Sequence, residues 1–302
     1  MIVVVAPGQG AQSPGFLAPW LEDADAREHL HRLSEAAGLD LAHFGTDADA
    51  DTIRATEIAQ PLLVAAALIS FAGLRNADAA AVAGHSVGEV AAAVLAGVLS
   101  EADGMRFVAA RGRAMADAAG RVATGMAAVV GGDEQAVVDR LAELDLTPAN
   151  RNGGGQIVAA GELPALAALQ ADPPARARVI PLTVAGAFHT RFMAPAVAPL
   201  TELAASLSPA DPRRRLWTNH DGSEVDSGAA FLDLLVGQVA SPVRWDSTME
   251  SFAAAGVTGI IELTPAGTLT GLAKRALKGV PTVAVKTPVD LAAANDLLDR
   301  TA

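Results

Sequence analysis

The feature that most constrains this chain is a serine bracketed by glycines, GHSVGE at residues 84–89. An apolar run precedes it at residues 79–83, and a helix-forming run follows at residues 90–99. This order predicts a strand, a sharp turn and a helix, with Ser86 at the turn. The flanking glycines lack Cβ atoms, so the strand and the helix can pack closely enough to present the serine hydroxyl. Ser86 is therefore the candidate nucleophile.

A serine nucleophile needs an oxyanion site and a base. The helix after Ser86 directs free backbone N–H groups and the positive end of its dipole at the turn. The base is usually histidine. The chain has six histidines, at positions 29, 31, 43, 85, 189 and 220. His189 lies in a Gly/Ala-rich bend and is the candidate, although spacing alone leaves the choice open. His85 is expected to point away from Ser86 and to pack in the interior.

Composition limits the class of protein. The chain has 302 residues, of which 51% are hydrophobic, so it can bury a large core, yet no apolar segment reaches the ~18 unbroken residues of a membrane span. Residues 1–7 lack a basic stretch and predict a first core strand instead of a signal peptide, so we expect a cytoplasmic protein. The absence of cysteine excludes disulfides and thiolate chemistry. Because the histidines also lack ligand spacing, we expect no metal site.

The charge balance argues against nucleic acid as a partner. The net charge is −12 and the isoelectric point is near 4.9, whereas a nucleic-acid binder normally carries a basic stripe. An acidic partner would need a local basic patch. Two candidates are residues 213–215 and the cluster of Lys274, Arg275 and Lys278, and each can equally be a solvated face.

The order of elements predicts two subdomains. Apolar strands at 1–6 and 79–83 alternate with helical runs at 60–74, 88–98 and 101–119, which indicates an α/β fold with a parallel sheet.

Between residues 122 and 185 the pattern changes to two strand–helix repeats and a closing strand. The expected strands are 126–130, 156–160 and 177–184, and the expected helices are 133–144 and 163–171. This is a ferredoxin-like α+β pattern. We therefore expect a large subdomain of residues 1–121 and 186–302, with residues 122–185 inserted as the small one. After the insertion we expect a strand near 215–219 and another at 258–263.

Six motifs in order resemble those of the malonyl-CoA:acyl carrier protein transacylases, the acyltransferase family of fatty-acid and polyketide synthesis. They are PGQGAQ (7–12), GHSVGE (84–89), RGRAM (111–115), GMAA (125–128), GAFHT (186–190) and QVASPVRW (238–245). The resemblance covers nearly the whole chain. It implies a hydrolase-like large domain with a ferredoxin-like small domain.

The resemblance also implies catalytic roles. Ser86 would be acylated, with His189 as its general base. The backbone N–H groups of Gln9 and Val87 would form the oxyanion hole. A backbone carbonyl near Gln238 would orient the imidazole in place of an acidic side chain, so the base would be a dyad.

Further positions match the family's substrate-binding residues. Arg111 would hold the free carboxylate of malonyl with two parallel hydrogen bonds, helped by Gln238. Phe188 would crowd a methyl branch on the acyl group. Met115, in the RGRAM motif, and Asn152, beside the mouth of the site, complete the set. Four of these five residues have a plainer alternative: a surface residue for Arg111, a cap or surface position for Gln238, core packing for Phe188, and a glycine turn before the strand at 156–160 for Asn152.

The activity that the resemblance implies is transfer of malonyl from malonyl-CoA to the phosphopantetheine thiol of acyl carrier protein, through a malonyl-serine. No cofactor is expected, and the protein is expected to be a monomer. Because acyl carrier protein is acidic, Arg191, Lys274 and Arg275 are the expected positive rim. Three alternatives stay open: the same transfer dedicated to a polyketide pathway, a serine esterase or thioesterase, and a non-catalytic scaffold.

Overall fold

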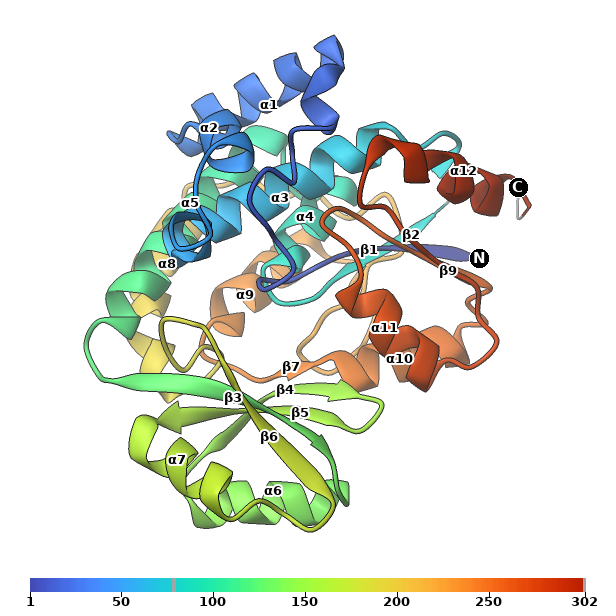
Figure 1. Ribbon diagram of the computed structural model, residues 1–302. Helices are drawn as coiled ribbons and strands as arrows, with labels where there is room; N and C mark the ends of the chain where they lie inside the picture. The colour runs from blue at the N-terminus through green and yellow to red at the C-terminus, as the bar shows by residue number, and fades with distance from the viewer. Residues whose placement is uncertain (78–79, 301–302) are drawn as a thin grey trace.

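The computed structural model describes residues 1–77 and 80–300, so residue 79 of the expected strand at 79–83 lies outside the described residues. The chain forms two sheets, one above the other in the view of Figure 1, and both chain ends lie on the same side. Within the described residues, no helix combines the length and the apolar character that a membrane crossing requires.

The first sheet is parallel and is buried on both faces. Its strands are β1 (Ile2–Ala6), β2 (Ala81–Gly84), β8 (Gly259–Glu262) and β9 (Thr282–Ala284), in the order β2-β1-β8-β9. Neighbouring strands pair in parallel. The continuous apolar run of β1 is typical of a strand covered on both sides. This sheet is the predicted parallel core.

Alternate residues of β1 enter two separate clusters. Val4 packs with the helices α3 (Thr56–Ala72), α4 (Gly88–Leu95) and α5 (Glu101–Ala119). Val3 packs on the other face with residues of α10 (Trp245–Ala254) and α11 (Thr268–Ala276). In the part of the chain that the structure describes, five further α-helices lie outside residues 122–185: α1 (Ala24–Ala37), α2 (Leu41–Thr46), α8 (Ala194–Ala204), α9 (Gly228–Gln238) and α12 (Leu291–Asp299).

The second sheet is mainly antiparallel, in the order β6-β3-β5-β4-β7. Its strands are β3 (Thr124–Gly131), β4 (Thr147–Gly153), β5 (Gln156–Glu162), β6 (Ala177–Leu182) and β7 (Val243–Arg244). The helices α6 (Glu134–Glu143) and α7 (Leu163–Ala171) cover one face (Figure 1). From the opposite face Met126, Val158 and Ala160 join the main core. The second sheet therefore packs with this face against the core that surrounds the parallel sheet.

The sequence analysis missed one strand and predicted another that is not formed as such. Residues 147–153 form the strand β4, and the glycine turn expected before the strand at 156–160 follows it at residues 154–155, so Asn152 lies in the strand and not in the turn. The sequence of β4 is polar and contains proline, so it does not show the pattern of a strand. The strand forms because β5 and β7 pair with it on both sides. The strand expected at 215–219 is reduced to isolated bridges at Leu216 and Trp217. The expected helix at 101–119 is confirmed at both ends.

Candidate active site

Ser86 lies at a sharp turn between β2 and α4, as the glycine pattern predicts. Its φ of 53° is in the left-handed region, which costs energy for a residue with a side chain. A Cβ on Gly84 would lie 2.0 Å from the backbone carbon of Gly88, and one on Gly88 would lie 2.2 Å from the oxygen of Ala6. The turn can therefore form only with glycine at both positions.

His189 is in hydrogen-bond contact with Ser86. Its Nε2 lies 2.6 Å from the serine Oγ, and its Nδ1 lies 2.9 Å from the backbone oxygen of Gln238. Because that carbonyl can only accept, Nδ1 carries the proton and Nε2 is free to accept one from the serine. Burial, with the nearby positive charge of Arg111, lowers the pKa of His189 to about 3. The imidazole is therefore neutral at physiological pH and ready to act as a base.

Two backbone N–H groups next to Ser86 have no acceptor within the described residues. They belong to Gln9 and Val87, and both residues line the same cavity as Ser86. The Gln9 side chain is held by the carbonyl of Arg54 at 3.1 Å, which fixes the loop. Free N–H groups at such a turn can stabilise a developing oxyanion.

Arg111 is buried behind the dyad, so the plainer prediction of a surface arginine is wrong. It is 1% exposed, and its guanidinium donates to the side-chain oxygens of Gln60 at 2.6 Å and Gln238 at 2.7 Å. Burial lowers its pKa to about 10, so the group stays charged at neutral pH. A buried cation whose direct contacts are neutral amides can receive a ligand carboxylate.

Three residues of this network escaped the sequence predictions. Glu89 is buried and accepts hydrogen bonds from the backbone N–H of Asn219 at 2.6 Å and from the Gln238 side chain. Burial raises its pKa to about 8. Asn219 in turn accepts from the backbone N–H of Ser86 at 2.7 Å, and Gln60 holds Arg111. Glu89 and Gln60 each interrupt an apolar helical run, and that is the signal that could have found them.

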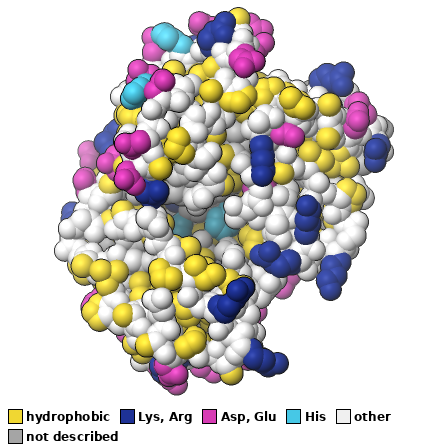
Figure 2. Space-filling model, in the orientation of Figure 1, with side chains coloured by type: hydrophobic (Ala, Val, Ile, Leu, Met, Phe, Trp, Pro, Cys, Tyr) yellow, Lys and Arg dark blue, Asp and Glu magenta, His cyan; other side chains and the backbone are white. Residues whose placement is uncertain are grey.

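The cavity beside Ser86 has a volume of about 80 Å³. Six of the residues predicted to belong to the site line this cavity: Ser86, Val87, Gln9, His189, Met115 and Phe188. Phe188 is only 6% exposed, so it both packs in the core and forms part of the wall. In Figure 2 a hollow separates the two parts of the molecule, with histidine atoms on its floor.

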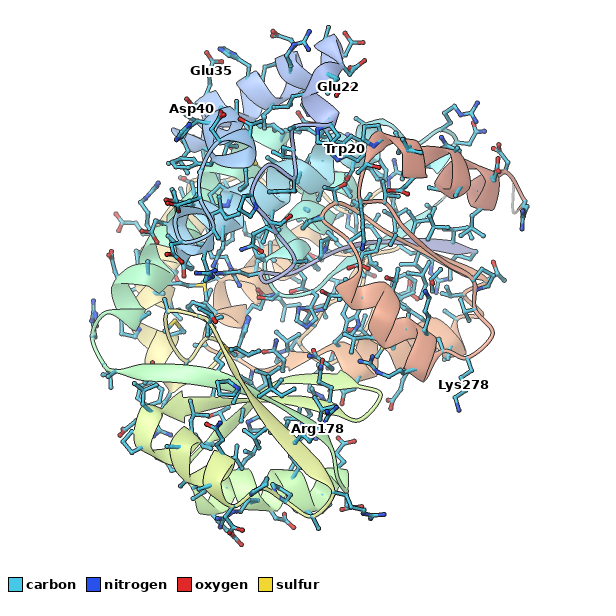
Figure 3. All side chains as sticks on the ribbon, in the orientation of Figure 1. Trp20, Glu22, Glu35, Asp40, Arg178 and Lys278 are labelled. Atoms are coloured by element: carbon cyan, nitrogen blue, oxygen red, sulfur yellow. The ribbon has the colours of Figure 1, made fainter. Side chains whose placement is uncertain are left out.

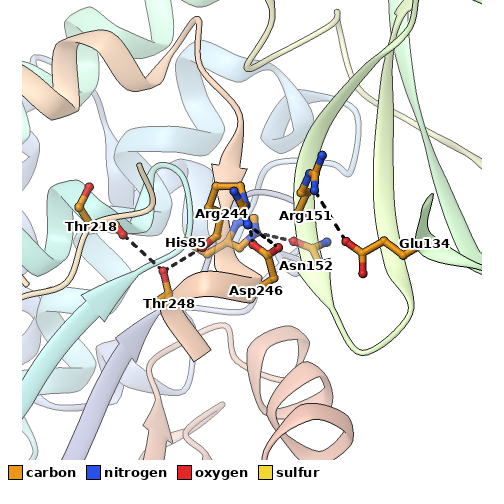
Figure 4. A network of polar contacts seen from close by, with 8 residues as sticks. All are labelled: His85, Glu134, Arg151, Asn152, Thr218, Arg244, Asp246 and Thr248. Atoms are coloured by element: carbon orange, nitrogen blue, oxygen red, sulfur yellow. Dashed lines mark hydrogen bonds and ion pairs between the residues drawn. The ribbon is translucent and has the colours of Figure 1, made fainter. Parts of the chain in front are cut away.

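Three predicted site residues, Arg111, Gln238 and Asn152, do not line this cavity, whereas Asn150 does. The Oδ1 of Asn152 lies 2.9 Å from Nε2 of His85, whose ring also contacts Trp245 edge-on at 5.6 Å. His85 is buried, which confirms its predicted packing, but it lines the same cavity as Ser86, so the expectation that it points away from Ser86 is not borne out. Burial lowers the pKa of His85. Figure 4 shows this contact beside the Arg244–Asp246 ion pair, where β4 meets β7. Asn152 thus links the turn at Ser86 to the second sheet.

Of the three residues of the expected positive rim, one is engaged in an ion pair. Arg191 forms an ion pair with Asp145, whereas Lys274 and Arg275 are exposed in the last turn of α11. In Figure 2 Lys and Arg side chains gather on the side of the hollow formed by α10 and α11. Among residues 1–77 and 80–300, no three His, Asp or Glu side chains cluster in a way that could hold a metal ion.

The fold and this site are those of a serine-dependent acyl-transfer enzyme. The sequence matches the acyl transferase domain family over residues 3–295. The chain therefore belongs to the acyl transferase family, which is the family suggested by the motifs.

Relatives support this membership over nearly the whole length. The malonyl CoA-acyl carrier protein transacylase of Mycobacterium tuberculosis H37Rv is 51% identical over 296 residues, covering 96% of this chain and 98% of the relative. The protein of the same name from Escherichia coli K12 is 32% identical, covering 97% and 98%. The crystal structure of MCAT from Mycobacterium tuberculosis superposes with a TM-score of 0.94 at 50% identity, covering 97% and 99%.

Proposed function

We propose that this chain transfers a malonyl group from malonyl-CoA to the phosphopantetheine thiol of acyl carrier protein, and so supplies fatty-acid synthesis. The observation that carries the proposal is the buried, charged Arg111 beside a serine–histidine dyad. Malonyl differs from acetyl by a free carboxylate, which this guanidinium can bind. The relatives named malonyl CoA-acyl carrier protein transacylase support the same activity.

In the first half-reaction, Nε2 of His189 takes the proton of the Ser86 hydroxyl while Oγ attacks the thioester carbonyl. The N–H groups of Gln9 and Val87 donate to the oxyanion that forms. The C–S bond then breaks, and the coenzyme A thiolate takes the proton from His189. Loss of one donor of such a hole typically costs ~10²–10³ in rate.

The second half-reaction reverses these steps with a different thiol. The phosphopantetheine thiol gives its proton to His189 and attacks the malonyl-Ser86 ester. Oγ leaves and recovers the proton, so protons and leaving groups balance. Arg111 and Gln238 hold the carboxylate throughout, while Phe188 and Met115 form the wall of the acyl pocket. Every step uses groups of this chain and of the two substrates, so we propose that no cofactor takes part.

We propose two subdomains, residues 1–121 with 186–302, and residues 122–185. The order β6-β3-β5-β4, with two helices on one face, supports a ferredoxin-like small subdomain. The segment that forms β7 belongs to the large subdomain in sequence but extends the small subdomain's sheet. The hydrolase-like character of the large subdomain, a monomeric state and a cytoplasmic location stay predictions.

We propose that acyl carrier protein docks against Lys274 and Arg275. Both are exposed at the end of α11, and Arg275 lies against Gly154 in the turn after β4, close to the hollow. Lys278, further along the chain, points outward in Figure 3 and is the less suitable member of this cluster. Arg191 is the weaker part of the rim because Asp145 pairs with it.

Specific observations bear on two alternative functions, a hydrolase and a transferase of a polyketide pathway. A hydrolase normally orients its histidine with an acidic side chain, whereas here the carbonyl of Gln238 does so. A polyketide role has a structural parallel, a type II PKS acyl carrier protein in complex with its malonyl-transacylase, at 29% identity and a TM-score of 0.90. The mycobacterial relative, at 51% identity, is named for malonyl transfer to acyl carrier protein without reference to a polyketide system.

The test measures acylation of Ser86 by malonyl-CoA and by acetyl-CoA in wild type and Arg111→Ala. Hydrogen bonds to charged groups contribute about 1.5–3 kcal/mol, so malonyl acylation should fall roughly 10- to 100-fold while acetyl acylation changes little. Arg113→Ala, two residues along the same helix and exposed, is the matched control and should leave both rates unchanged. An equal fall with both donors, or rapid turnover of simple esters, would contradict the proposal.

A further inference from the structure

We propose that Glu89 is a positioning residue for recognition of the malonyl carboxylate, because it fixes the amide orientation of Gln238 and thereby aligns Arg111. The proposal rests on the malonyl transfer function proposed above. Glu89 does not face the cavity; it acts through Gln238.

The hydrogen bonds around Glu89 leave only one orientation for the Gln238 amide. The carboxylate accepts from the Gln238 Nε2 through Oε2, and from the backbone N–H of Asn219 through Oε1. An amide side chain has a donor end and an acceptor end. With Nε2 directed at Glu89, Oε1 must face the other way, where it accepts from Arg111 at 2.7 Å. The reversed amide would place N–H groups against the guanidinium.

Glu89 and Arg111 are placed so that the guanidinium stays available for the carboxylate of the substrate. Glu89 and Arg111 are both 1% exposed, and a buried cation needs a compensating anion. In direct contact, however, a carboxylate would occupy the guanidinium and compete with the substrate. With Gln238 between them, Glu89 supplies a negative charge once it is ionised, above its pKa of about 8, while the direct contacts of Arg111 remain neutral amides. The arginine Nε has no partner within the described residues.

The same carboxylate also supports the nucleophile turn, so the test must separate two effects. Asn219, held by Glu89, donates to the carbonyl of Gly84 at 2.8 Å and accepts from the backbone N–H of Ser86. A purely structural role would slow acylation by every donor equally. A role in carboxylate recognition would slow acylation by malonyl-CoA in particular.

The experiment measures the ratio of Ser86 acylation rates with malonyl-CoA and acetyl-CoA in wild type and Glu89→Gln. It is run at pH 8.5, above the pKa of about 8 to which burial raises Glu89, so that the carboxylate predominates in wild type. In the variant, the new amide places a donor against the Gln238 Nε2 and favours the reversed orientation. We expect the malonyl-to-acetyl ratio to fall at least ~10-fold, the lower limit for loss of a hydrogen bond to a charged group.

Glu262→Gln is the matched control. Glu262 is also fully buried and accepts from three backbone N–H groups at the start of α11, without contact to the acyl cavity. Its loss can lower the free energy of unfolding but should leave the ratio unchanged.

The double variant Glu89→Gln, Gln238→Glu adds a second test. It keeps the number of carboxylates but puts one directly against Arg111. We expect the ratio to stay low even where the free energy of unfolding recovers.

An unchanged ratio in Glu89→Gln, or an equal fall with both donors, would overturn the inference. The double variant would overturn it if it regained wild-type preference for malonyl. Failure of the wild type to take malonyl onto Ser86 would instead reject the proposed function, so the two failures are distinguishable.

Discussion

The two sheets of this protein contribute differently to the site. The parallel sheet is buried on both faces, and its strand ends hold Ser86 and, through α4 and α5, Glu89 and Arg111. The antiparallel sheet has one face covered by its own helices, and it contributes mostly apolar wall residues such as Met126 and Val158. In Figure 1 it lies below the parallel sheet, with the hollow of Figure 2 between them.

The difference shows where charge can be fixed. The strand end and the helices packed around it are buried, and we infer that this part is rigid and holds a buried ion in one geometry. The antiparallel sheet reaches the site through side-chain contacts such as His85–Asn152. We infer that chemistry and carboxylate recognition belong to the parallel part, and that the second sheet closes the acyl pocket opposite Phe188 and Met115. The predictions below test that division, from the largest expected effect to the smallest.

The largest contrast should come from two strand glycines, one in each sheet. A Cβ on Gly84 meets backbone at 2.0 Å, whereas one on Gly125 in β3 meets the end of the exposed Leu163 side chain at 3.1 Å. Gly84→Ala should therefore lower the free energy of unfolding by at least about 3 kcal/mol or prevent folding. Gly125→Ala should lower it by no more than about 1 kcal/mol. Urea unfolding measures both. Equal costs would remove the claim that the parallel part is the rigid one.

His189 should make stability depend on pH. Its pKa is about 3 when folded, against an ordinary value of 6.5, so the unfolded chain binds the extra proton first and stability falls as pH drops below 6.5. Between pH 7.5 and 5 the wild type should lose roughly 2 kcal/mol more than His189→Gln. His31→Gln, at an exposed histidine, should follow the wild type. Identical slopes in wild type and His189→Gln would show that the folded histidine is not held neutral.

Loss of the Asn152–His85 contact, which links the two sheets, should also lower stability. Asn152→Ala leaves the buried Nε2 of His85 without its partner, which should cost about 1–3 kcal/mol. Gln135→Ala removes an exposed amide contact to Asp139 in α6 and should change stability by less than ~0.5 kcal/mol. Thermal unfolding of both variants makes the comparison. A neutral Asn152→Ala would mean that the sheets are held together without this contact.

Selectivity for malonyl should rise with pH in the wild type. Glu89 changes from acid to carboxylate around pH 8, while Arg111, with a pKa of about 10, and His189, with a pKa of about 3, keep their charge states. The malonyl-to-acetyl ratio should therefore increase by up to ~10-fold between pH 7 and 9. In Glu89→Gln the ratio should be flat. A parallel rise in both proteins would assign the titration to another group.

The smallest effect should appear at the rim. Lys274→Glu with Arg275→Glu should raise the KM for acyl carrier protein by roughly fivefold or less per contact, since exposed ion pairs contribute about 0.2–1 kcal/mol. Acylation by malonyl-CoA should not change. Arg213→Glu reverses a charge in the other basic patch and serves as the control. A larger rise in KM from Arg213→Glu would move the docking surface there.

The sequence predicted the local features of the site better than its connections. The turn at Ser86 depends on neighbours in sequence, and glycines at 84 and 88 leave few alternatives. Glu89, Gln60 and Asn219 come from separate elements, and only the fold shows that their polar atoms meet. Interactions between distant segments were thus the part that local pattern could not supply. The strand β4 escaped prediction for a different reason: its sequence is polar and contains proline, although its partner β5 follows after a two-residue turn.

The most direct test of the central claim is the intact mass of the protein after brief incubation with malonyl-CoA. Wild type should gain one malonyl group, and Ser86→Ala should gain none. Addition of phosphopantetheinylated acyl carrier protein should then discharge the wild-type adduct. An adduct of equal yield on Ser86→Ala would contradict the nucleophile. No adduct on wild type, with the carrier protein still unloaded, would contradict the proposed transfer itself.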